Sequence, residues 1–329
     1  MSTTSIRLSL ALAASLAALI QGCADPAGDT DIDDIDAEEE DAAESAQAVS
    51  YGGTLVLHDE KKLSTLFGAS GDYEASGVQV LGSDLYVVFD NKDKIGKVPV
   101  SLAGTAVYTA GTLSSSTEQY EGITFDSYGT QHFYLVQEVS PGMVVQLDGA
   151  GTSQGEEYQS TGVSFGDSNK GFEGVAWLRR NNTDYLLALC EAGDCGTQTG
   201  TEYPGRIRIL AQSGSSWVSQ GYMRICTDSS CTSGPFSDYS DIALRPMPDG
   251  SVKVAITSQE SKALWVGTLS ASSWSLSGGT VYYFPGSSYC NVEGVTFLSN
   301  TRFAMVSDMT SSGGGCNDKD ESVHIFDLP

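Results

Sequence analysis

The sequence predicts an all-β fold, a five-bladed β-propeller, and three observations support this fold class. A short strand, a polar turn, a strongly apolar strand and a closing acidic residue recur five times between residues 75 and 308. A third apolar strand follows each copy, and a fourth strand follows the first four copies. Antiparallel units of four strands that return every 45 to 67 residues are typical of propeller blades.

The five first strands share one pattern, and each is expected to be the innermost strand of its blade. They read ASGVQVL from residue 75, YEGITFD from 120, FEGVAWL from 172, YSDIALR from 239 and VEGVTFL from 292. The second strands are apolar on both faces, which indicates sheets that stack face to face. The acidic residues that close the second strands are Asp90, Glu138, Glu191, Glu260 and Asp308.

The ends of the repeat region predict how the ring closes. The fifth copy has three strands, and a lone strand, Gly52 to His58, precedes the first copy. We expect this N-terminal strand to pair with Ser322 to Leu328 and to become the outer strand of the last blade. The stretch from Tyr51 to Tyr73 is too short for a sixth blade.

The first 23 residues have the pattern of an export signal. Arg7 precedes an apolar run from Leu8 to Ile20, which is too short for a permanent membrane span. Residues 20–23 (Ile-Gln-Gly-Cys) resemble the lipobox of bacterial lipoproteins, and this resemblance implies that Cys23 is the lipid anchor. The alternative is an ordinary secretory signal with a chance cysteine.

Residues 24–50 are expected to form a disordered tether, and residues 51–329 the propeller domain. Asp25 to Glu44 contains eleven acidic residues and no basic residue, so it repels itself and cannot bury apolar surface. Without Arg7 and these eleven acids the chain has 16 basic (17 minus 1) and 31 acidic (42 minus 11) residues, a net charge of −15. This balance argues against nucleic acid as a partner and favours cations.

Six cysteines besides Cys23 suit an oxidising compartment outside the cytoplasm. Fifteen pairings are possible, and proximity in the sequence favours Cys190 with Cys195, Cys226 with Cys231, and Cys290 with Cys316. Zinc ligation is the weaker alternative, because the spacing is not C-x2-C and the chain has three histidines.

Carboxylates are the candidate metal ligands. Glu121, Glu173 and Glu293 begin equivalent innermost strands, so they should meet at one mouth of the central channel, with Asp241 close by. Converging carboxylates repel one another unless they are protonated or share a cation, and calcium prefers such oxygen ligands. The other candidate ligands are the closing acids Asp90, Glu138, Glu191 and Asp308. In the alternative reading, the glutamates accept hydrogen bonds from backbone amides of the next blade.

The first strands that begin with Glu-Gly and the second strands that end in an acid resemble the SdiA-regulated family of bacterial extracytoplasmic propellers. The esterase-like phytase group is a looser relative. The resemblance covers roughly Gly52 to Leu328. It implies a five-bladed propeller with a bound calcium ion and no established reaction.

Three functions compete, and we rank a ligand-binding module tethered to the membrane first. A metal-dependent hydrolase of the lactonase or phosphoesterase type, with the channel ion polarising its substrate, ranks second. A structural envelope protein ranks third. No catalytic residue is assigned, because the residues around the three histidines show no acid–base constellation. We expect an exported monomer that is lipid-anchored to the bacterial cell envelope, or else secreted. The expected partner is an extracytoplasmic ligand of unknown identity. The protein itself should contact the membrane only through the lipid anchor.

Overall fold

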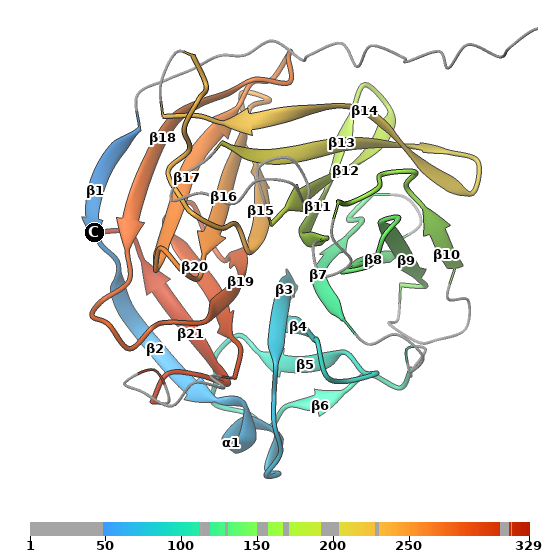
Figure 1. The fold of residues 1–329 in the computed structure, drawn as a ribbon. Helices are drawn as coiled ribbons and strands as arrows, with labels where there is room; N and C mark the ends of the chain where they lie inside the picture. The colour runs from blue at the N-terminus through green and yellow to red at the C-terminus, as the bar shows by residue number, and fades with distance from the viewer. Residues whose placement is uncertain are drawn as a thin grey trace, which may run out of the picture. The chain divides into compact units, whose positions relative to one another are not determined.

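The chain folds into five sheets of antiparallel strands, one of which carries an additional parallel edge strand, arranged as the blades of a β-propeller, which confirms the predicted fold class (Figure 1). The computed structural model describes residues 49–111, 113, 119–128, 131–149, 157–166, 171–191, 204–227, 230–309, 316 and 318–329. One short helix, α1 (Leu63–Phe67), precedes the first blade. Predictions for Met1 to Ala48, including the signal, the anchor Cys23 and the tether up to Ala48, lie outside the described residues. The last residue of the predicted tether, Ser50, begins strand β1.

Each blade is built from strands that follow one another in the chain. The first blade contains β3 (Ala75–Leu81), β4 (Asp84–Phe89), β5 (Gly96–Pro99) and β6 (Val107–Tyr108). The second contains β7 (Tyr120–Phe125), β8 (Phe133–Gln137), β9 (Met143–Leu147) and β10 (Glu157–Ser160). The third contains β11 (Phe172–Arg180), β12 (Thr183–Cys190), β13 (Gly205–Ser213) and β14 (Ser216–Ile225).

The last two blades also take strands from the N-terminal part of the domain. The fourth contains β15 (Asp241–Pro246), β16 (Val252–Ser258), β17 (Ala263–Leu269), β18 (Leu276–Tyr283) and, at its edge, β1 (Ser50–Thr54). The fifth contains β19 (Val292–Phe297), β20 (Arg302–Ser307), β21 (Ser322–Asp327) and β2 (Val56–Lys62). Pairing of β2 with β21 closes the ring, as predicted.

The predicted closing strand, Gly52 to His58, is divided in the structure. Its first half belongs to β1, which runs parallel to β18 of the fourth blade, and its second half begins β2. Leu55 separates the two, because its side chain is buried in the apolar core between the fourth and fifth blades and its N–H donates to the Tyr283 carbonyl over 2.9 Å. The strand that pairs with the last blade therefore starts later than predicted and extends to Lys62.

The hydrophobic core consists of five clusters, each between two neighbouring blades. Between the third and fourth blades, for example, Leu187 and Ile207 pack with Ile242 and Val254. The second strand of every blade contributes to the clusters on both of its sides, which explains why these strands are apolar on both faces.

The first strands line the centre of the ring, and each contacts the next in the order β3, β7, β11, β15, β19 and back to β3. Glycine permits this close approach. A Cβ on Gly77 would lie 2.7 Å from the Glu121 carbonyl oxygen, and one on Gly122 would lie 2.8 Å from Gly174 Cα. In four blades this glycine is the third residue of the innermost strand, after a glutamate in three of them and after Ser76 in the first. The fourth blade has Asp241 at the equivalent position.

Candidate functional site

A β-bulge places the glutamates of the Glu-Gly pattern at the channel mouth. In the second blade Tyr120 pairs with Gln137 and Gly122 pairs with Val136, so Glu121 is the extra residue between them. The same register shift occurs at Ser76, Glu173 and Glu293 in three other blades. Bulges redirect side chains away from the regular ladder. The pattern Glu-Gly therefore encodes both the bulge and the close approach of the next strand.

Equivalent backbone hydrogen bonds hold the closing acids beside the beginning of the innermost strands. In each of four blades the N–H of the closing acid donates to the carbonyl of the residue just before the first strand. These pairs are Asp90 with Glu74 (2.8 Å), Glu138 with Gln119 (3.1 Å), Glu191 with Gly171 (3.5 Å) and Asp308 with Asn291 (2.9 Å). Closing acids and innermost glutamates consequently share one end of the ring.

Three of the predicted ligands come close enough to hold one ion. Carboxylate oxygens of Glu138, Glu173 and Glu191 lie within 4.8 Å of one another, and the described part of the chain holds no other such trio of candidate ligands. Glu173 comes from β11, Glu191 follows β12 and Glu138 follows β8, so two blades contribute. Among the described residues, the Glu173 Oε1 atom is buried without a hydrogen-bond partner.

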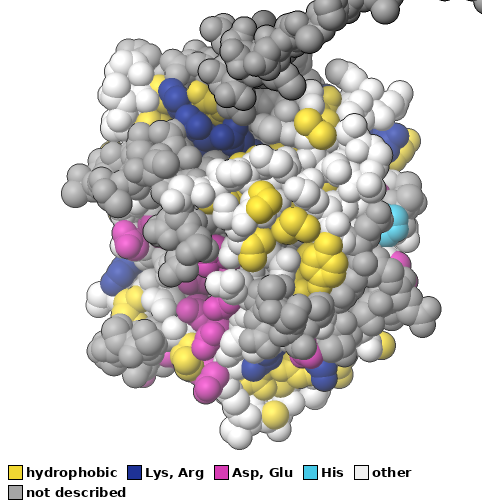
Figure 2. Space-filling model, turned by 45° about the vertical axis from the view of Figure 1, so that its right-hand side comes forward, with side chains coloured by type: hydrophobic (Ala, Val, Ile, Leu, Met, Phe, Trp, Pro, Cys, Tyr) yellow, Lys and Arg dark blue, Asp and Glu magenta, His cyan; other side chains and the backbone are white. Residues whose placement is uncertain are grey.

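The carboxylates at this mouth oppose one another's ionisation. Burial raises the pKa values of Glu121, Glu173 and Glu293 well above the usual range, and neighbouring carboxylates raise them further. Burial also raises the pKa of Asp308 to about 7, and the adjacent Asp90 contributes to this shift. Such a cluster must either take up protons or be neutralised by a cation. Figure 2 shows acidic side chains gathered in a strip on the face drawn, apart from most of the basic ones.

The fourth blade departs from this arrangement, and Asp241 has a different role from the trio. Its carboxylate accepts the Val295 N–H of β19 and its own neighbour's N–H, that of Ile242, each over 2.8 Å. Ser240 occupies the position of the innermost glutamates, and the closing acid Glu260 accepts a hydrogen bond from Ser237 Oγ over 3.1 Å. For Asp241, these contacts favour the backbone-amide reading over metal ligation.

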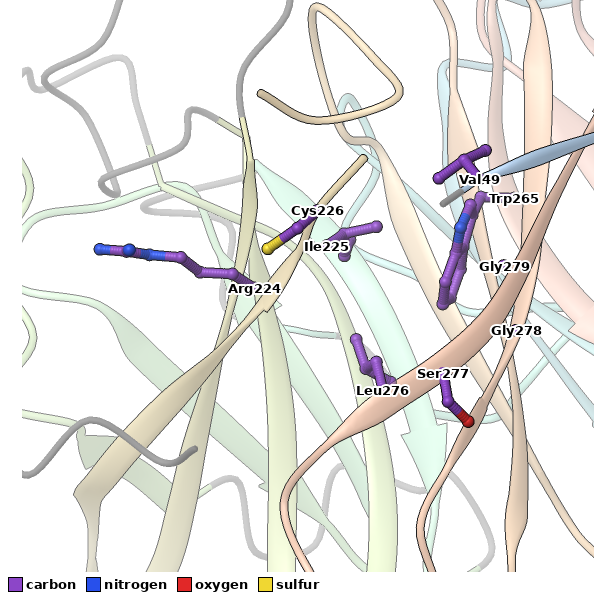
Figure 3. Close-up of a pocket in the computed structure, with 9 residues that line it drawn as sticks. All are labelled: Val49, Arg224, Ile225, Cys226, Trp265, Leu276, Ser277, Gly278 and Gly279. Carbon is purple, nitrogen blue, oxygen red and sulfur yellow. The ribbon is translucent and has the colours of Figure 1, made fainter. Parts of the chain in front are cut away.

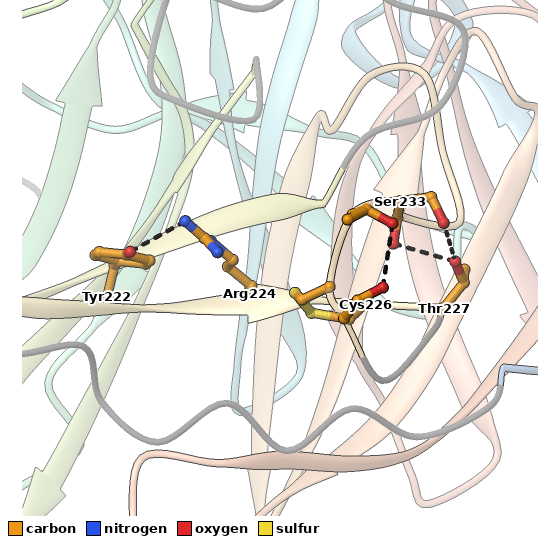
Figure 4. The surroundings of a disulfide bond; sticks show 8 residues. Tyr222, Arg224, Cys226, Thr227 and Ser233 are labelled. Carbon is orange, nitrogen blue, oxygen red and sulfur yellow. Dashed lines mark hydrogen bonds between the residues drawn. A yellow bond between two sulfur atoms is a disulfide. The ribbon is translucent and has the colours of Figure 1, made fainter.

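Two of the predicted disulfides are confirmed. Cys226 and Cys231 are bonded with their Cα atoms 4.9 Å apart, next to a turn in which Thr227 Oγ1 donates to the Ser233 carbonyl over 3.1 Å (Figure 4). Cys290 and Cys316 are bonded with a Cα separation of 5.5 Å, so they link the segment before β19 to the segment before β21.

The third predicted disulfide falls partly outside the described residues. Cys190 is fully buried at the end of β12, but its predicted partner Cys195 is not among the described residues.

No helix in the described part of the chain is long and apolar enough to cross a membrane.

A buried polar network between the fourth and fifth blades was not predicted from the sequence, in which His324 reads as a strand residue. His324 Nε2 lies 2.7 Å from Ser307 Oγ, and its Nδ1 lies 3.5 Å from Glu60 Oε2. Tyr289 donates to the same Glu60 oxygen over 3.1 Å, and Lys319 forms an ion pair with Glu60. The His324 and Lys319 side chains hold the pKa of Glu60 at about 2.

This network has the order of a serine, a histidine and an acid, but it lacks access for a substrate. Ser307 is 1% exposed and His324 is fully buried. The three side chains stand side by side because β20, β21 and β2 are neighbouring strands, and Glu60 pairs directly with His324 in the ladder. The arrangement fastens the closing strand β2 to the last blade and gives no sign of nucleophilic catalysis.

Cavities on the described surface differ in their capacity for a ligand. One, beside Trp265 and Val49 and with Arg224 pointing away from them, has a volume of about 10 Å³, no more than one water molecule requires (Figure 3). Two others, of about 470 Å³ and 420 Å³, lie at the ends of the innermost strands that are opposite the acidic mouth. Both are within the range of small-molecule sites.

Comparisons with known proteins support the fold and no finer assignment. No protein-family model matches the chain, and no curated protein does either. The GH43_1 enzyme from Xanthomonas citri is similar in structure, with 8% identity, 81% of this chain and 89% of that chain covered, and a TM-score of 0.51.

Two further solved structures match with TM-scores below 0.5. Glutaminyl cyclase from Myxococcus xanthus has 9% identity, with 86% of this chain and 100% of that chain covered and a TM-score of 0.48. The major allergen Mala s 1 from Malassezia sympodialis has 12% identity, with 79% of each chain covered and a TM-score of 0.47. At these identities the likeness is one of β-propeller fold alone. Membership of the SdiA-regulated family stays a prediction.

Proposed function

We propose that the protein is an extracytoplasmic calcium-binding β-propeller that presents its acidic channel mouth to a ligand. The observation that carries the proposal is the trio Glu138, Glu173 and Glu191, whose oxygens lie within 4.8 Å of one another. Calcium–oxygen distances are about 2.3–2.6 Å, so oxygens on opposite sides of one ion are roughly 5 Å apart. The trio therefore matches the diameter of a calcium coordination sphere.

The chemistry of the donors also suits calcium. All three are carboxylates, which calcium prefers, and the buried Glu173 Oε1 has lone pairs that no described donor satisfies. Glu121 and Glu293 lie close enough to raise the pKa of Glu173, so they would add negative potential around the ion. A bound divalent cation would relieve this repulsion, and its remaining positions would be open to water or to a ligand.

The compartment is inferred from the disulfides. Cys226–Cys231 and Cys290–Cys316 favour an oxidising environment outside the cytoplasm. Lipid anchoring at Cys23 and the acidic tether remain predictions from the sequence. Under this proposal the protein is a monomer that binds an extracytoplasmic ligand and no nucleic acid.

The test combines metal analysis with thermal melting in chelator and in calcium. We expect the purified protein to contain calcium and its melting temperature to fall in chelator, because a ligand at one hundred times its Kd stabilises the native state by about 2.7 kcal/mol. The Glu173→Gln variant should lose most of this response. Glu260→Gln is the matched control, because it removes the same charge from a closing acid that bonds Ser237 instead of joining the trio. Its response should equal that of the parent.

The acidic tether is present in the parent and in both variants, so a difference between their responses to chelator comes from the trio and not from the tether. If parent and Glu173→Gln respond equally to chelator, calcium binds elsewhere, and if the parent shows no response, the carboxylates serve packing. The hydrolase alternative is tested with the calcium-loaded protein on a lactone and on p-nitrophenyl phosphate. Turnover that chelator and Glu173→Gln both abolish would replace the binding module by a hydrolase.

A further inference from the structure

The cavity of about 420 Å³ described above lies at the end of the innermost strands that is opposite the acidic mouth. Strand β11 connects the two, since Glu173 stands near its beginning and Arg180 ends it. Seven residues of extended strand separate these positions by roughly 23 Å. Turns of the second, third and fourth blades form the cavity, whose walls include Ser127, Tyr128, Trp177, Arg180, Asn181 and Met247.

Arg180 lines this cavity, and its guanidinium has no carboxylate partner among the described residues. Its guanidinium donates to the main-chain carbonyls of Ser270 over 2.6 Å and of Ser273 over 3.0 Å. The same group lies 4.2 Å from the centre of the Trp274 ring. These contacts fix the orientation of the guanidinium, but none of them is with an anion, in a chain that has 42 acidic and 17 basic residues. A half-buried, oriented guanidinium favours a carboxylate.

Tyr128 supplies a fixed aromatic surface beside it. Tyr128 is 62% exposed, and the centre of its ring lies 4.6 Å from the Arg179 guanidinium. Arg179 is itself held by both carboxylate oxygens of Asp184, each at 3.1 Å, so its charge is neutralised. The Tyr128 N–H donates to Asp126 Oδ1 over 2.6 Å, which fixes the backbone. An exposed ring supported in this way is suited to stacking against a planar group.

We propose that this cavity binds a small cyclic carboxylate, whose carboxylate group pairs with Arg180 and whose ring lies against Tyr128. This site is separate from the acidic mouth. Its ligand carries the opposite charge from the cation proposed there, and no residue of the trio lines it.

The experiment measures binding of benzoate to the full-length protein by titration calorimetry and by saturation-transfer NMR, in the presence of chelator. Chelator removes any ion at the acidic mouth that could coordinate the carboxylate. Benzamide, which has a similar shape and no charge, is the matched probe. We expect saturable benzoate binding with a Kd on the order of 1 mM, and binding of benzamide about tenfold weaker.

Three variants locate the binding. Arg180→Gln should weaken benzoate binding about tenfold or more, whereas Arg245→Gln should leave it nearly unchanged. Arg245 bonds Asn300 over 2.8 Å at the same end of the molecule and does not line the cavity, so this control changes the net charge equally. Tyr128→Ala removes an exposed ring, preserves the Arg180 contacts, and should weaken benzoate and benzamide alike.

The proposal is overturned if benzoate does not saturate, if benzamide binds equally well, or if Arg245→Gln is as harmful as Arg180→Gln. Should Arg180→Gln fail to fold, Tyr128→Ala decides, and unchanged benzoate binding by that variant contradicts the site. Glu173→Gln should bind benzoate like the parent. Failure here is therefore distinguishable from failure of the calcium proposal, which is read from the response to chelator.

Discussion

At the scale of single residues, Glu173 is a buried carboxyl group whose ionisation is opposed by several neighbouring carboxylates. It is the member of the trio that stands on an innermost strand, and its pKa is raised by burial and then by Glu121, Glu191 and other acids of the mouth. A carboxyl group whose pKa is raised binds a proton in the native state that the unfolded chain has already released. Protonation and cation binding are therefore competing ways of stabilising the same fold.

This competition predicts the pH dependence of the metal-free protein. Because these pKa values are raised, their contribution to the unfolding free energy is fully present below the unfolded value of 4.5 and is lost as the pH rises through the folded values. For Asp308, whose pKa rises from 3.8 to about 7 on folding, this contribution to the unfolding free energy is lost between these two pH values. In chelator, the melting temperature should fall between about pH 5 and about pH 8.

Melting curves in chelator and in saturating calcium check this expectation. Calcium should flatten the decline, because it neutralises the ionised carboxylates at the higher pH. Glu173→Gln in chelator should also be flatter than the parent, while Glu260→Gln should follow the parent. A metal-free parent that melts at a higher temperature near pH 8 than near pH 5 would show that the cluster is not held protonated.

At the scale of elements, two kinds of contact hold neighbouring innermost strands together. Four blades use a glycine, which lets the neighbouring backbone approach, and the fourth blade uses Asp241, which joins β15 to β19 through the Val295 N–H. Comparison of the five sequence copies suggested that Asp241 is a candidate metal ligand that stands one position after the glutamates of the other blades. The structure shows instead a carboxylate that satisfies two backbone donors inside the ring.

Asp241→Gly therefore tests this role, although it restores the pattern of the other blades. The variant leaves the buried Val295 N–H without its acceptor, and we expect the unfolding free energy to fall by about 2 kcal/mol, after the relief of a buried charge offsets part of the loss. Asp241→Asn retains one acceptor and should lose less. Urea denaturation measures both variants. Equal stability of Asp241→Gly and the parent would show that the carboxylate contributes nothing to this contact.

At the scale of the whole molecule, the ring is closed by β2, and β1 adds an edge strand to the neighbouring blade. Four of the five residues of β1 are exposed, and its contacts include the stacking of Tyr51 on Tyr283 at 6.2 Å. In contrast, β2 completes the last blade and carries Glu60, which joins Lys319, Tyr289 and the buried His324.

Two truncations distinguish these roles. Removal of residues 1–54 should leave a monomer that melts within a few degrees of the parent, because a loss of about 1 kcal/mol shifts the melting temperature of a domain this large by only a few degrees. Removal of residues 1–62 exposes the edge of β21 and should produce aggregation or unfolding. Size-exclusion chromatography and melting measure both. If the longer truncation behaves like the shorter one, β2 does not close the ring.

Patterns within the chain were enough to predict the five blades, the closure of the last blade by an N-terminal strand and two disulfides. These features depend on the alternation of apolar residues, on repeat length and on cysteine proximity, all of which are local. The Glu-Gly pattern likewise marked the innermost strands, because a bulge beside a tight backbone contact needs those residues in adjacent positions.

Only the tertiary structure decided which carboxylates meet. Glu138, Glu173 and Glu191 come from two blades, and their separation depends on how the blades pack and where the bulges turn the side chains. Burial of Leu55 between blades divided the predicted closing strand, and the packing of β15 against β19 gave the Asp241 carboxylate a backbone donor, the Val295 N–H. The cavity around Arg180 and Tyr128 has no sequence signature, because its walls come from turns that adjoin only after the blades have packed into a ring.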